Sequence, residues 1–528
     1  MHDDKTTKTN VVGYLRANRF SMSASSILIL MAVYFVVLLL IARATSRKES
    51  NKQFFLAGKA APWYLVAFGM IGASLSGITF ISIPGKVGIQ NDAGAFVDQF
   101  SYMQMVLGYL VGYVFIALVL MPLYYRLNLT SIYTYLEQRF GKETYKTGAF
   151  YFLISRTTGA AIRLLLVANV LQEFVLGTWG VPFEITVALS ILLIWVYTYR
   201  GGINTIIWTD TLQTLFMLVA LGISMYLLSD AVGWNERGLV TSIAESDYGQ
   251  WFFFNDALGN PHYFWKEFLG GIFICIGMTG MDQDMMQKNL ACKNIREAQT
   301  NMLSFAGVLV VVNALFLGLG VLLYAYAAQE GIDIPVSDTG KLRTDLLFPT
   351  IALRGNLGSA LSIFFLLGLI AAAYSSADSA LTSLTTSVCV DFRNIHEREE
   401  KAQIKLRKQT HVLMSAVLFV VILLLHYTLD LSAIGQLIFL AGFTYGPLIG
   451  IFLYGIVTNK QLPKYAFPVI AIISPLLTYI LFSNSVDWFN GLKFGALHIV
   501  LNSVITFLLL FVVGMITKVS TTTTNQTV

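Results

Sequence analysis

The stretch "APWYLVAFGMIGASLSGITFISIPGKVG", residues 61–88, is apolar and long enough to cross a bilayer, yet it holds several residues that disfavour a regular helix. The interrupting residues are Gly69, Gly72, Gly77, Pro84 and Gly85. One interpretation is a kinked helix, because glycine and proline kink helices without further purpose. The other is a broken helix, in which carbonyl groups freed at mid-membrane depth are available to bind an ion.

The composition of the whole chain is that of a membrane protein. Of its 528 residues, 56% are hydrophobic and only 12% are charged, which soluble globular domains do not approach. The three cysteines, Cys275, Cys292 and Cys389, have no paired or CxxC spacing, so they indicate neither a disulfide framework nor a zinc site. The net charge of +5 reflects loop topology and gives no reason to expect a nucleic-acid partner.

Apolar stretches of roughly twenty residues predict an all-α polytopic protein with about 13 transmembrane helices. They lie near 25–45, 62–88, 100–125, 144–174, 182–199, 202–230, 264–288, 297–327, 357–391, 406–427, 433–457, 465–483 and 494–516. Lysine and arginine gather in alternate loops, which are therefore expected to be cytoplasmic. An odd number of spans then places the N terminus outside and the C terminus inside.

The segments between the spans are too short to form a catalytic domain. Residues 1–22 are expected to be a polar tail and residues 517–528 a cytoplasmic tail. No Walker, HExxH or GxSxG motif occurs, so we do not expect an enzyme. The six histidines are scattered, and His262 lies at a predicted loop end, where a solvated side chain is expected.

Charged residues inside predicted spans cost about 3 kcal/mol each, so each one needs a partner or a function. Arg156 and Arg163 are seven residues apart and therefore share one helical face. Asp282 and Asp284, in "GMDQDMMQK", lie near a predicted cytoplasmic end, where we expect them to reach water.

Two further intramembrane acids are Asp210, in "GGINTIIWTDTLQTL", and Asp378, in "AAAYSSADSALTSLTTSVCVDF", residues 371–392. Stripes of small and hydroxyl residues often pack membrane helices closely with no ligand involved. Here, adjacent serines and a carboxylate one turn later favour a cation, because hard cations bind several oxygen ligands. The shared helical face is formed by Ala372, Ser375, Ser376, Ser379 and Thr382.

These stretches resemble the sodium:solute symporter family, and the resemblance extends from about Ser25 to Lys518. It rests on "FFLAGKAAPWY", "GGINTIIWTDTLQ", "DQDMMQKNLACKN" and "SSADSALTSLTTSVCVDF", which follow in the family's order and spacing. The resemblance implies the leucine-transporter architecture, an inverted 5+5 helix repeat. The two repeats would span 62–230 and 264–457, with one helix (25–45) before them and two (465–516) after them.

The resemblance also implies a sodium site. Its ligands would be the carbonyls of Gly72, Leu75 and Ala372 and the hydroxyls of Ser375 and Ser376. Some relatives bind a second sodium, which would involve Asp210, Ser375, Asp378 and Ser379. Asp378 replaces the hydroxyl usual in the family, and its carboxylate could strengthen a second sodium site or bind a proton.

For the substrate, the resemblance argues against a plain hexose, because Ser74, Ile78 and Thr79 replace the polar residues of sugar-transporting relatives. "SLSGITFISIP" is closer to sialic-acid transporters, where hydroxyls such as those of Ser76 and Thr79 and an arginine bind the carboxylate. Either Arg156 or Arg163 could supply that arginine. The alternative is that these arginines are structural, paired with acids or carbonyls.

The resemblance implies a sodium-driven symporter that imports a small organic solute by alternating access. A carboxylate-bearing sugar acid such as sialic acid is the expected substrate, and a bacterial inner membrane is the expected location. The expected partners are the solute, Na+ and membrane lipid. Open alternatives are a symporter of a neutral sugar or other small solute, a proton-coupled transporter of the same fold, and a sensor that binds solute without moving it.

Overall fold

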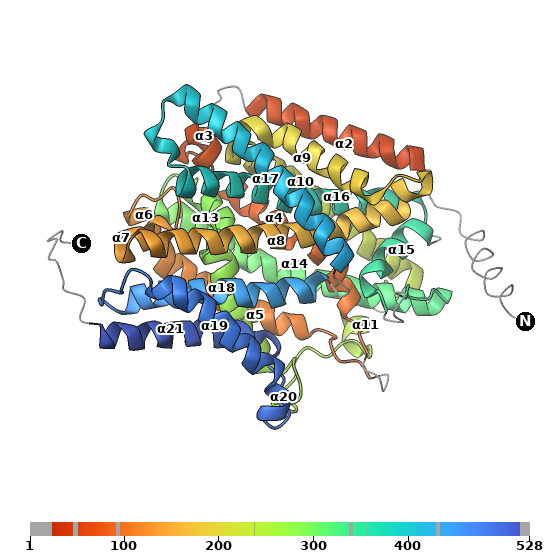
Figure 1. Cartoon of the computed structure of the whole chain (residues 1–528). Coiled ribbons are helices and arrows are strands. Elements are labelled where there is room, and N and C mark those ends of the chain that lie inside the picture. The colour runs from red at the N-terminus through yellow and green to blue at the C-terminus, as the bar shows by residue number, and fades with distance from the viewer. Residues whose placement is uncertain are drawn as a thin grey trace, which may run out of the picture.

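The computed structural model describes residues 24–45, 51–90, 95–236, 238–336, 342–355, 357–428 and 433–517, and these are almost entirely helical (Figure 1). Within these ranges, eleven helices are long and apolar enough to cross a membrane. The two predicted spans outside that count are 182–199, whose apolar helix Phe183–Tyr199 is shorter, and 264–288, which is broken. The predicted tail at 1–22 and residues 518–528 lie outside the described residues.

The first half of the chain forms one leading helix and five core helices. The leading helix is α2 (Ala24–Thr45), followed by the short α3 (Asn51–Leu56). The core helices are α4 (Trp63–Lys86), α5 (Ser101–Phe115) with its π-helical extension (Ile116–Leu120) into α6 (Met121–Arg126), α8 (Lys142–Phe174), α9 (Phe183–Gly201) and α10 (Ile203–Val232). Short connecting helices are α7 (Thr134–Phe140) and α11 (Leu239–Glu245).

The second half repeats this order. It begins with α12 (Phe264–Cys275), a π-helical segment (Ile276–Gly280) and α13 (Gln283–Leu290), and continues with α14 (Ile295–Glu330), α16 (Ser359–Ser387) with its π-helical end (Val388–Phe392), α17 (Glu400–Thr428) and α18 (Ala433–Val457). The last helices are α19 (Ala466–Ser483) and α21 (His498–Ile516), and short helices are α15 (Leu347–Arg354) and α20 (Ser485–Trp488). Single 3-10 turns lie at Ala57–Lys59, Leu176–Trp179, Thr344–Leu346, Ile395–Glu397 and Gly495–Leu497.

The first core helix, α4, is broken. Ser76 has φ 30° and ψ 171° and is the residue of α4 that leaves the helical conformation. A positive φ is strained for a residue with a side chain. The break leaves carbonyl groups of the preceding turn without intrahelical partners. The predicted break is therefore confirmed, although it falls at Ser76 and not at the glycines or Pro84.

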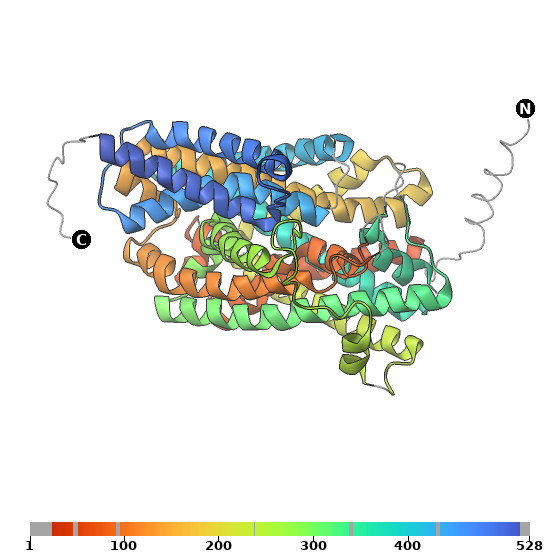
Figure 2. The same ribbon diagram turned by 90° about the horizontal axis from the view of Figure 1, so that it is seen from below.

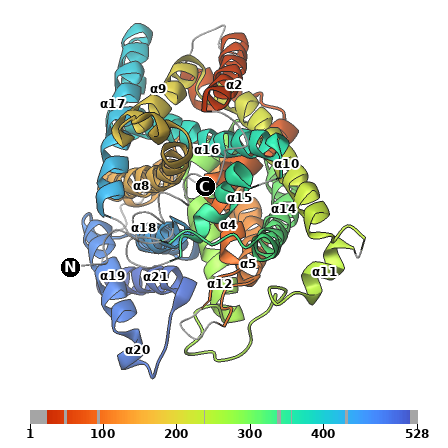
Figure 3. The ribbon, with the colours of Figure 1, turned by 90° about the vertical axis from the view of Figure 1, so that its right-hand side faces the viewer.

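The broken helix lies at the centre of the bundle. Viewed along the helix axes (Figure 3), α4 and α16 are central, with α2 and α9 on one side and α19 and α21 on the other. The long helices also run side by side in the view from below (Figure 2). Helix α4 packs against α10, α14 and α16. This packing places the break of α4 directly beside the Ser/Thr-rich part of α16.

The outer helices expose apolar faces. On α19, Val469, Ile472 and Leu476 are each more than half exposed and recur at helical spacing. The opposite face of α19 packs against α21. An exposed apolar stripe of this size on a bundle helix is typical of contact with lipid tails.

Candidate functional site

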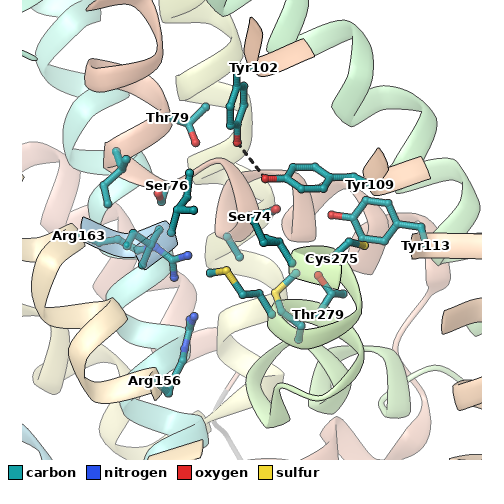
Figure 4. A pocket seen from close by; sticks show the side chains of 17 residues that line it. Ser74, Ser76, Thr79, Tyr102, Tyr109, Tyr113, Arg156, Arg163, Cys275 and Thr279 are labelled. Carbon is teal, nitrogen blue, oxygen red and sulfur yellow. Dashed lines mark hydrogen bonds between the residues drawn. The ribbon is translucent and has the colours of Figure 1, made fainter. Parts of the chain in front are cut away.

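A cavity lies beside the break in α4, enclosed by α4, α5, α8, α12 and α18 (Figure 4). All five residues predicted to contact substrate line it: Ser74, Ser76, Thr79, Arg156 and Arg163. Ser74 and Thr79 lie on either side of the break at Ser76, and all three residues line the cavity. The structure thus gathers the predicted substrate residues in one place.

Three tyrosines form the wall opposite the arginines. Tyr102, Tyr109 and Tyr113 follow one another on one face of α5, and the hydroxyls of Tyr102 and Tyr109 are 3.4 Å apart. None of the three was predicted to line the site, although their spacing of seven and four residues places them on one helical face. Aromatic rings with polar tips suit a solute that has both an apolar face and hydroxyl groups.

The two arginines differ in their partners. Arg156 forms an ion pair with Asp284, and its Nη2 donates to the carbonyl of Ser376 at 3.4 Å. Arg163 is 7% exposed and has no ion pair or hydrogen bond with any described residue; its Nε is buried without a partner. Its side chain points into the cavity beside Ser76 (Figure 4). In this conformation Arg156 is therefore paired with an acid, whereas Arg163 has no partner among the described residues.

The expectation that Asp282 and Asp284 reach water is wrong, because both are fully buried. The break between α12 and α13 creates a new helix N terminus inside the bundle, whose free N–H groups need acceptors. Asp282 caps α13 by accepting from the N–H groups of Asp284 at 2.9 Å and Met285 at 3.4 Å. Its other oxygen accepts from the hydroxyl of Tyr445.

The residues of the first predicted sodium site meet where α4 and α16 touch. The hydroxyl of Ser376 donates to the carbonyl of Ala73 at 3.2 Å, between the predicted carbonyl ligands of Gly72 and Leu75. The α16 ligands Ala372 and Ser375 are also fully buried, at 1% and 0% exposure. The break therefore brings backbone carbonyls and serine hydroxyls together in a water-poor part of the bundle.

The residues of the second predicted sodium site divide into two groups. The hydroxyl of Ser375 donates to Asp210 Oδ1 at 2.6 Å, and Lys288 Nζ lies 2.7 Å from Asp210 Oδ2. Asp378 instead accepts a 2.8 Å hydrogen bond from the hydroxyl of Tyr197. Ser379, the next residue in the sequence, is also buried, and its hydroxyl has no hydrogen-bond partner among the described residues.

Lys288 is the last residue of the predicted span 264–288 and begins the lysine-containing segment "KNLACKNIR", which was expected to be a cytoplasmic loop. The expectation is wrong for Lys288, because α13 carries it into the bundle, where it is 1% exposed. The available signal was the spacing of Asp284 and Lys288, four residues apart and thus on one face of a helix. Charged residues in a loop need not have this spacing, so the spacing favours a helix at this position.

A further charged cluster lies at the C-terminal end of α4. His262 Nε2 is 3.2 Å from Asp98 and its Nδ1 is 2.8 Å from Glu267, while Lys86 is 3.3 Å from Asp98. Burial of the ring opposes protonation, but the charges of Asp98 and Glu267 outweigh it, so the pKa of His262 is raised. The expectation of a freely solvated His262 is therefore wrong.

Comparison with known proteins places this architecture in a family. The model of the sodium:solute symporter family matches residues 54–472. The chain belongs to the sodium:solute symporter family. Na+ is therefore the ion to which this membrane symporter couples the movement of its solute.

Two bacterial relatives illustrate the similarity of this symporter to proteins of known function. It is 24% identical over 498 residues to the sodium/sialic acid symporter SiaT of Proteus mirabilis, which covers 91% of this chain and 92% of that protein. It is 25% identical over 429 residues to the sodium/sialic acid symporter NanT of Aliivibrio fischeri, covering 78% and 79%.

Solved structures show the fold of this family member. A Na+-coupled sialic acid symporter in a substrate-bound, outward-open state matches with a TM-score of 0.76 at 20% identity, covering 93% of this chain and 98% of that chain. A nucleobase-cation-symport-1 transporter in a closed conformation matches with a TM-score of 0.50 at 15% identity, covering 89% and 94%. The predicted fold class, an all-α membrane protein of the leucine-transporter type, is confirmed.

The Asp210–Lys288 ion pair yields a test of charge pairing. We expect Asp210→Asn and Lys288→Met each to destabilise the protein by about 3–5 kcal/mol, because each leaves an uncompensated buried charge. The double variant should regain most of the loss. Thermal unfolding of detergent-purified protein measures this. Replacing the exposed Lys464, which pairs with Glu143 at 3.0 Å, by Met should change little. Additive losses in the double variant would contradict the pairing.

Proposed function

We propose that this symporter imports a small organic anion, a carboxylate-bearing sugar acid such as sialic acid, through the cavity beside the α4 break. The observation that carries this proposal is the unpaired guanidinium of Arg163. A buried cation without a partner is costly, and a bound carboxylate removes that cost through two parallel hydrogen bonds. A neutral hexose offers no such group.

The rest of the cavity supports the same substrate class. Ser76 of α4 lies near Arg163, whereas Ser74 lies beside Tyr109 and Tyr113 and Thr79 lies toward Tyr102 (Figure 4). Hydroxyl donors suit the polar groups of a sugar ring, and aromatic side chains suit its apolar face. The relatives named as sodium/sialic acid symporters support this assignment.

We place the coupling Na+ at the contact between the α4 break and α16. Its ligands are the carbonyls of Gly72, Leu75 and Ala372 and the hydroxyls of Ser375 and Ser376. Bound Na+ joins the break of α4 to α16, and its release to a sodium-poor cytoplasm frees α4 to move and the solute to leave. A membrane potential of 100 mV adds about 2.3 kcal/mol for each charge that moves inward.

Exchange of each arginine for lysine tests the substrate class. Arg163→Lys should raise the half-saturating concentration for sialic acid uptake at least about tenfold, because lysine cannot reproduce the bidentate contact. Its melting temperature should stay close to the wild-type value. Arg156→Lys is the matched control, and we expect it mainly to lower the melting temperature through its ion pair with Asp284. Sodium-dependent uptake of a neutral hexose that is indifferent to Arg163→Lys would refute the proposal.

Loss of a single hydroxyl tests the sodium site. Ser376→Ala removes one ligand oxygen while the other ligands remain, so it should raise the Na+ concentration for half-maximal uptake several-fold with little change in stability. Ser383→Ala is the control, since Ser383 is buried on the same helix and, among the described residues, its hydroxyl bonds only the carbonyl of Ala380, at 3.0 Å. Equal sodium activation in both variants would rule out this ligand assignment.

We also propose that the protein lies in a bacterial inner membrane, with the loops rich in lysine and arginine in the cytoplasm. The charge asymmetry of the loops supports this orientation. Single cysteines introduced into the α7–α8 and α10–α11 connections of a cysteine-free variant should react with a membrane-impermeant reagent from opposite sides. We expect the α10–α11 connection to react in intact cells, and labelling of the α7–α8 connection there would reverse the orientation.

A further inference from the structure

Four ionisable side chains meet where α4 ends and α5 and α12 begin. Lys86 is the last residue of α4, and Glu267 lies in the first turn of α12. Asp98 and His262 lie in the connections just before α5 and α12. The side chains of Asp98, His262 and Glu267 are 8%, 19% and 6% exposed. Because the group is largely shielded from water, its charges interact more strongly than surface charges do.

The two nitrogens of the His262 ring each face a carboxylate. Nε2 lies 3.2 Å from Asp98 Oδ1, and Nδ1 lies 2.8 Å from Glu267 Oε1. A neutral imidazole donates at one nitrogen and accepts at the other, whereas an imidazolium donates at both. Since a carboxylate only accepts, this geometry fits the protonated ring. A neutral ring would turn a nitrogen lone pair toward one of the two acids.

The backbone of His262 is held on both sides. Asn260 Oδ1 accepts from its N–H at 2.9 Å, and Gln104 Nε2 on α5 donates to its carbonyl at 2.9 Å. Gln104 Oε1 also accepts from the N–H of Phe253 at 2.9 Å. These bonds do not involve the ring, so they are independent of its charge. Loss of the ring proton therefore changes the contacts of the ring while the backbone around it stays in place.

Asp98 connects this cluster to the wall of the solute cavity. The hydroxyl of Ser101, the first residue of α5, donates to Asp98 Oδ1 at 3.0 Å. The next residue, Tyr102, lines the cavity, and Lys86 Nζ lies 5.8 Å from the centroid of its ring. Tyr102 then meets Tyr109 through their hydroxyls (Figure 4). The charged cluster thus supports the turn of α5 from which the tyrosine wall begins.

We infer that His262 is a positioning residue for solute binding. Its imidazolium joins Asp98 to Glu267 and thereby holds the first turn of α5, which carries Tyr102. This inference rests on the proposed import of an organic anion. When the ring loses its proton, it can donate to only one of the two carboxylates, and Lys86 is the one cation left in the cluster. The first turn of α5 is then held less firmly, and the solute binds more weakly.

The ring changes charge within a range that is easily tested. Burial opposes its protonation, but the charges of Asp98 and Glu267 outweigh burial and raise the pKa of His262 above its usual value of about 6.5. The ring is therefore protonated at pH 6. The contacts that depend on its charge are lost as the pH rises through this raised pKa.

The other groups that face the cluster do not change charge in this range. They are the ammonium of Lys86 on α4, the hydroxyl of Tyr102 on α5 and the hydroxyl of Tyr324 on α14, which lies near Asp98 and donates to the carbonyl of Gly85 at 2.7 Å. Amines and phenols titrate at about pH 10 and carboxyl groups at about pH 4, so a carboxylate solute also keeps its charge between pH 6 and pH 9.

Binding of sialic acid to the full-length protein in detergent, measured by calorimetry at a fixed Na+ concentration from pH 6 to pH 9, tests this role. In the wild type the dissociation constant should rise at least about threefold, because one charge-assisted hydrogen bond is lost. His262→Gln should bind at pH 6 as weakly as the wild type does at pH 9, with no further pH dependence. His396→Gln is the matched control and should keep the wild-type profile, because His396 is exposed on the turn Ile395–Glu397.

Two further measurements distinguish positioning from a general effect on folding. Glu267→Gln keeps an acceptor near Nδ1 and removes one charge, so the midpoint of the binding profile should move to lower pH. Without solute, His262→Gln should melt below the wild type at pH 6, and this difference should shrink toward pH 9. The sign follows because a raised pKa stabilises the folded protein at low pH, and this stabilisation is lost as the pH rises.

The outcomes separate this inference from the proposed function. Wild-type protein that binds no sialic acid at any pH would overturn both. Binding with the same pH profile in the wild type and in His262→Gln would overturn the positioning role alone, as would an unmoved midpoint in Glu267→Gln. A pH-dependent difference in melting temperature together with a constant affinity for sialic acid would also overturn it, because the cluster would then stabilise the fold without affecting the cavity.

Discussion

The break of α4 at Ser76 is the constraint on which the rest of the site depends. A continuous membrane helix satisfies its own backbone, whereas a break leaves carbonyls without partners where no bulk water is present. Those carbonyls need polar partners, and the hydroxyl face of α16 supplies them through contacts such as Ser376 to Ala73. The same break turns the side chains around Ser76 into the cavity. The proposed ion site and the proposed solute cavity are adjacent because one backbone distortion forms part of both.

A second constraint is that buried charged side chains form ion pairs with residues from distant segments of the chain. The second broken helix brings α13 back among the core helices, and α13 contributes Asp284 to Arg156 and Lys288 to Asp210. Asp282 and Asp391 are buried acids that accept hydrogen bonds from neutral groups. Arg163 and Asp378 are two further buried charges that form no ion pair with a described residue. One is a cation at the solute cavity and the other is an acid near the cation sites. Coupling of an anionic solute to sodium would satisfy both.

The helices could be predicted from the sequence because each membrane span is a continuous stretch of apolar residues. The length of these stretches predicted most of the helices, and the Gly and Pro residues clustered in 61–88 predicted a broken helix. The hydroxyl face of α16 followed from helical periodicity, and its meeting with α4 followed from the family resemblance. The short α9 and the broken α12–α13 were the spans whose helices departed most from simple length and hydropathy.

The sequence by itself determined the membrane character, the order of the helices and the residue types available for ions and solute. Only the tertiary structure decided which charges neutralise each other. Arg156 and Arg163 are equivalent on a helical wheel, yet only Arg156 meets an acid, because α13 passes near one end of their shared face. Lys288 and Asp210 are 78 residues apart, and no local pattern records their contact. Electrostatic roles depend on distances between segments, and those distances are fixed by packing.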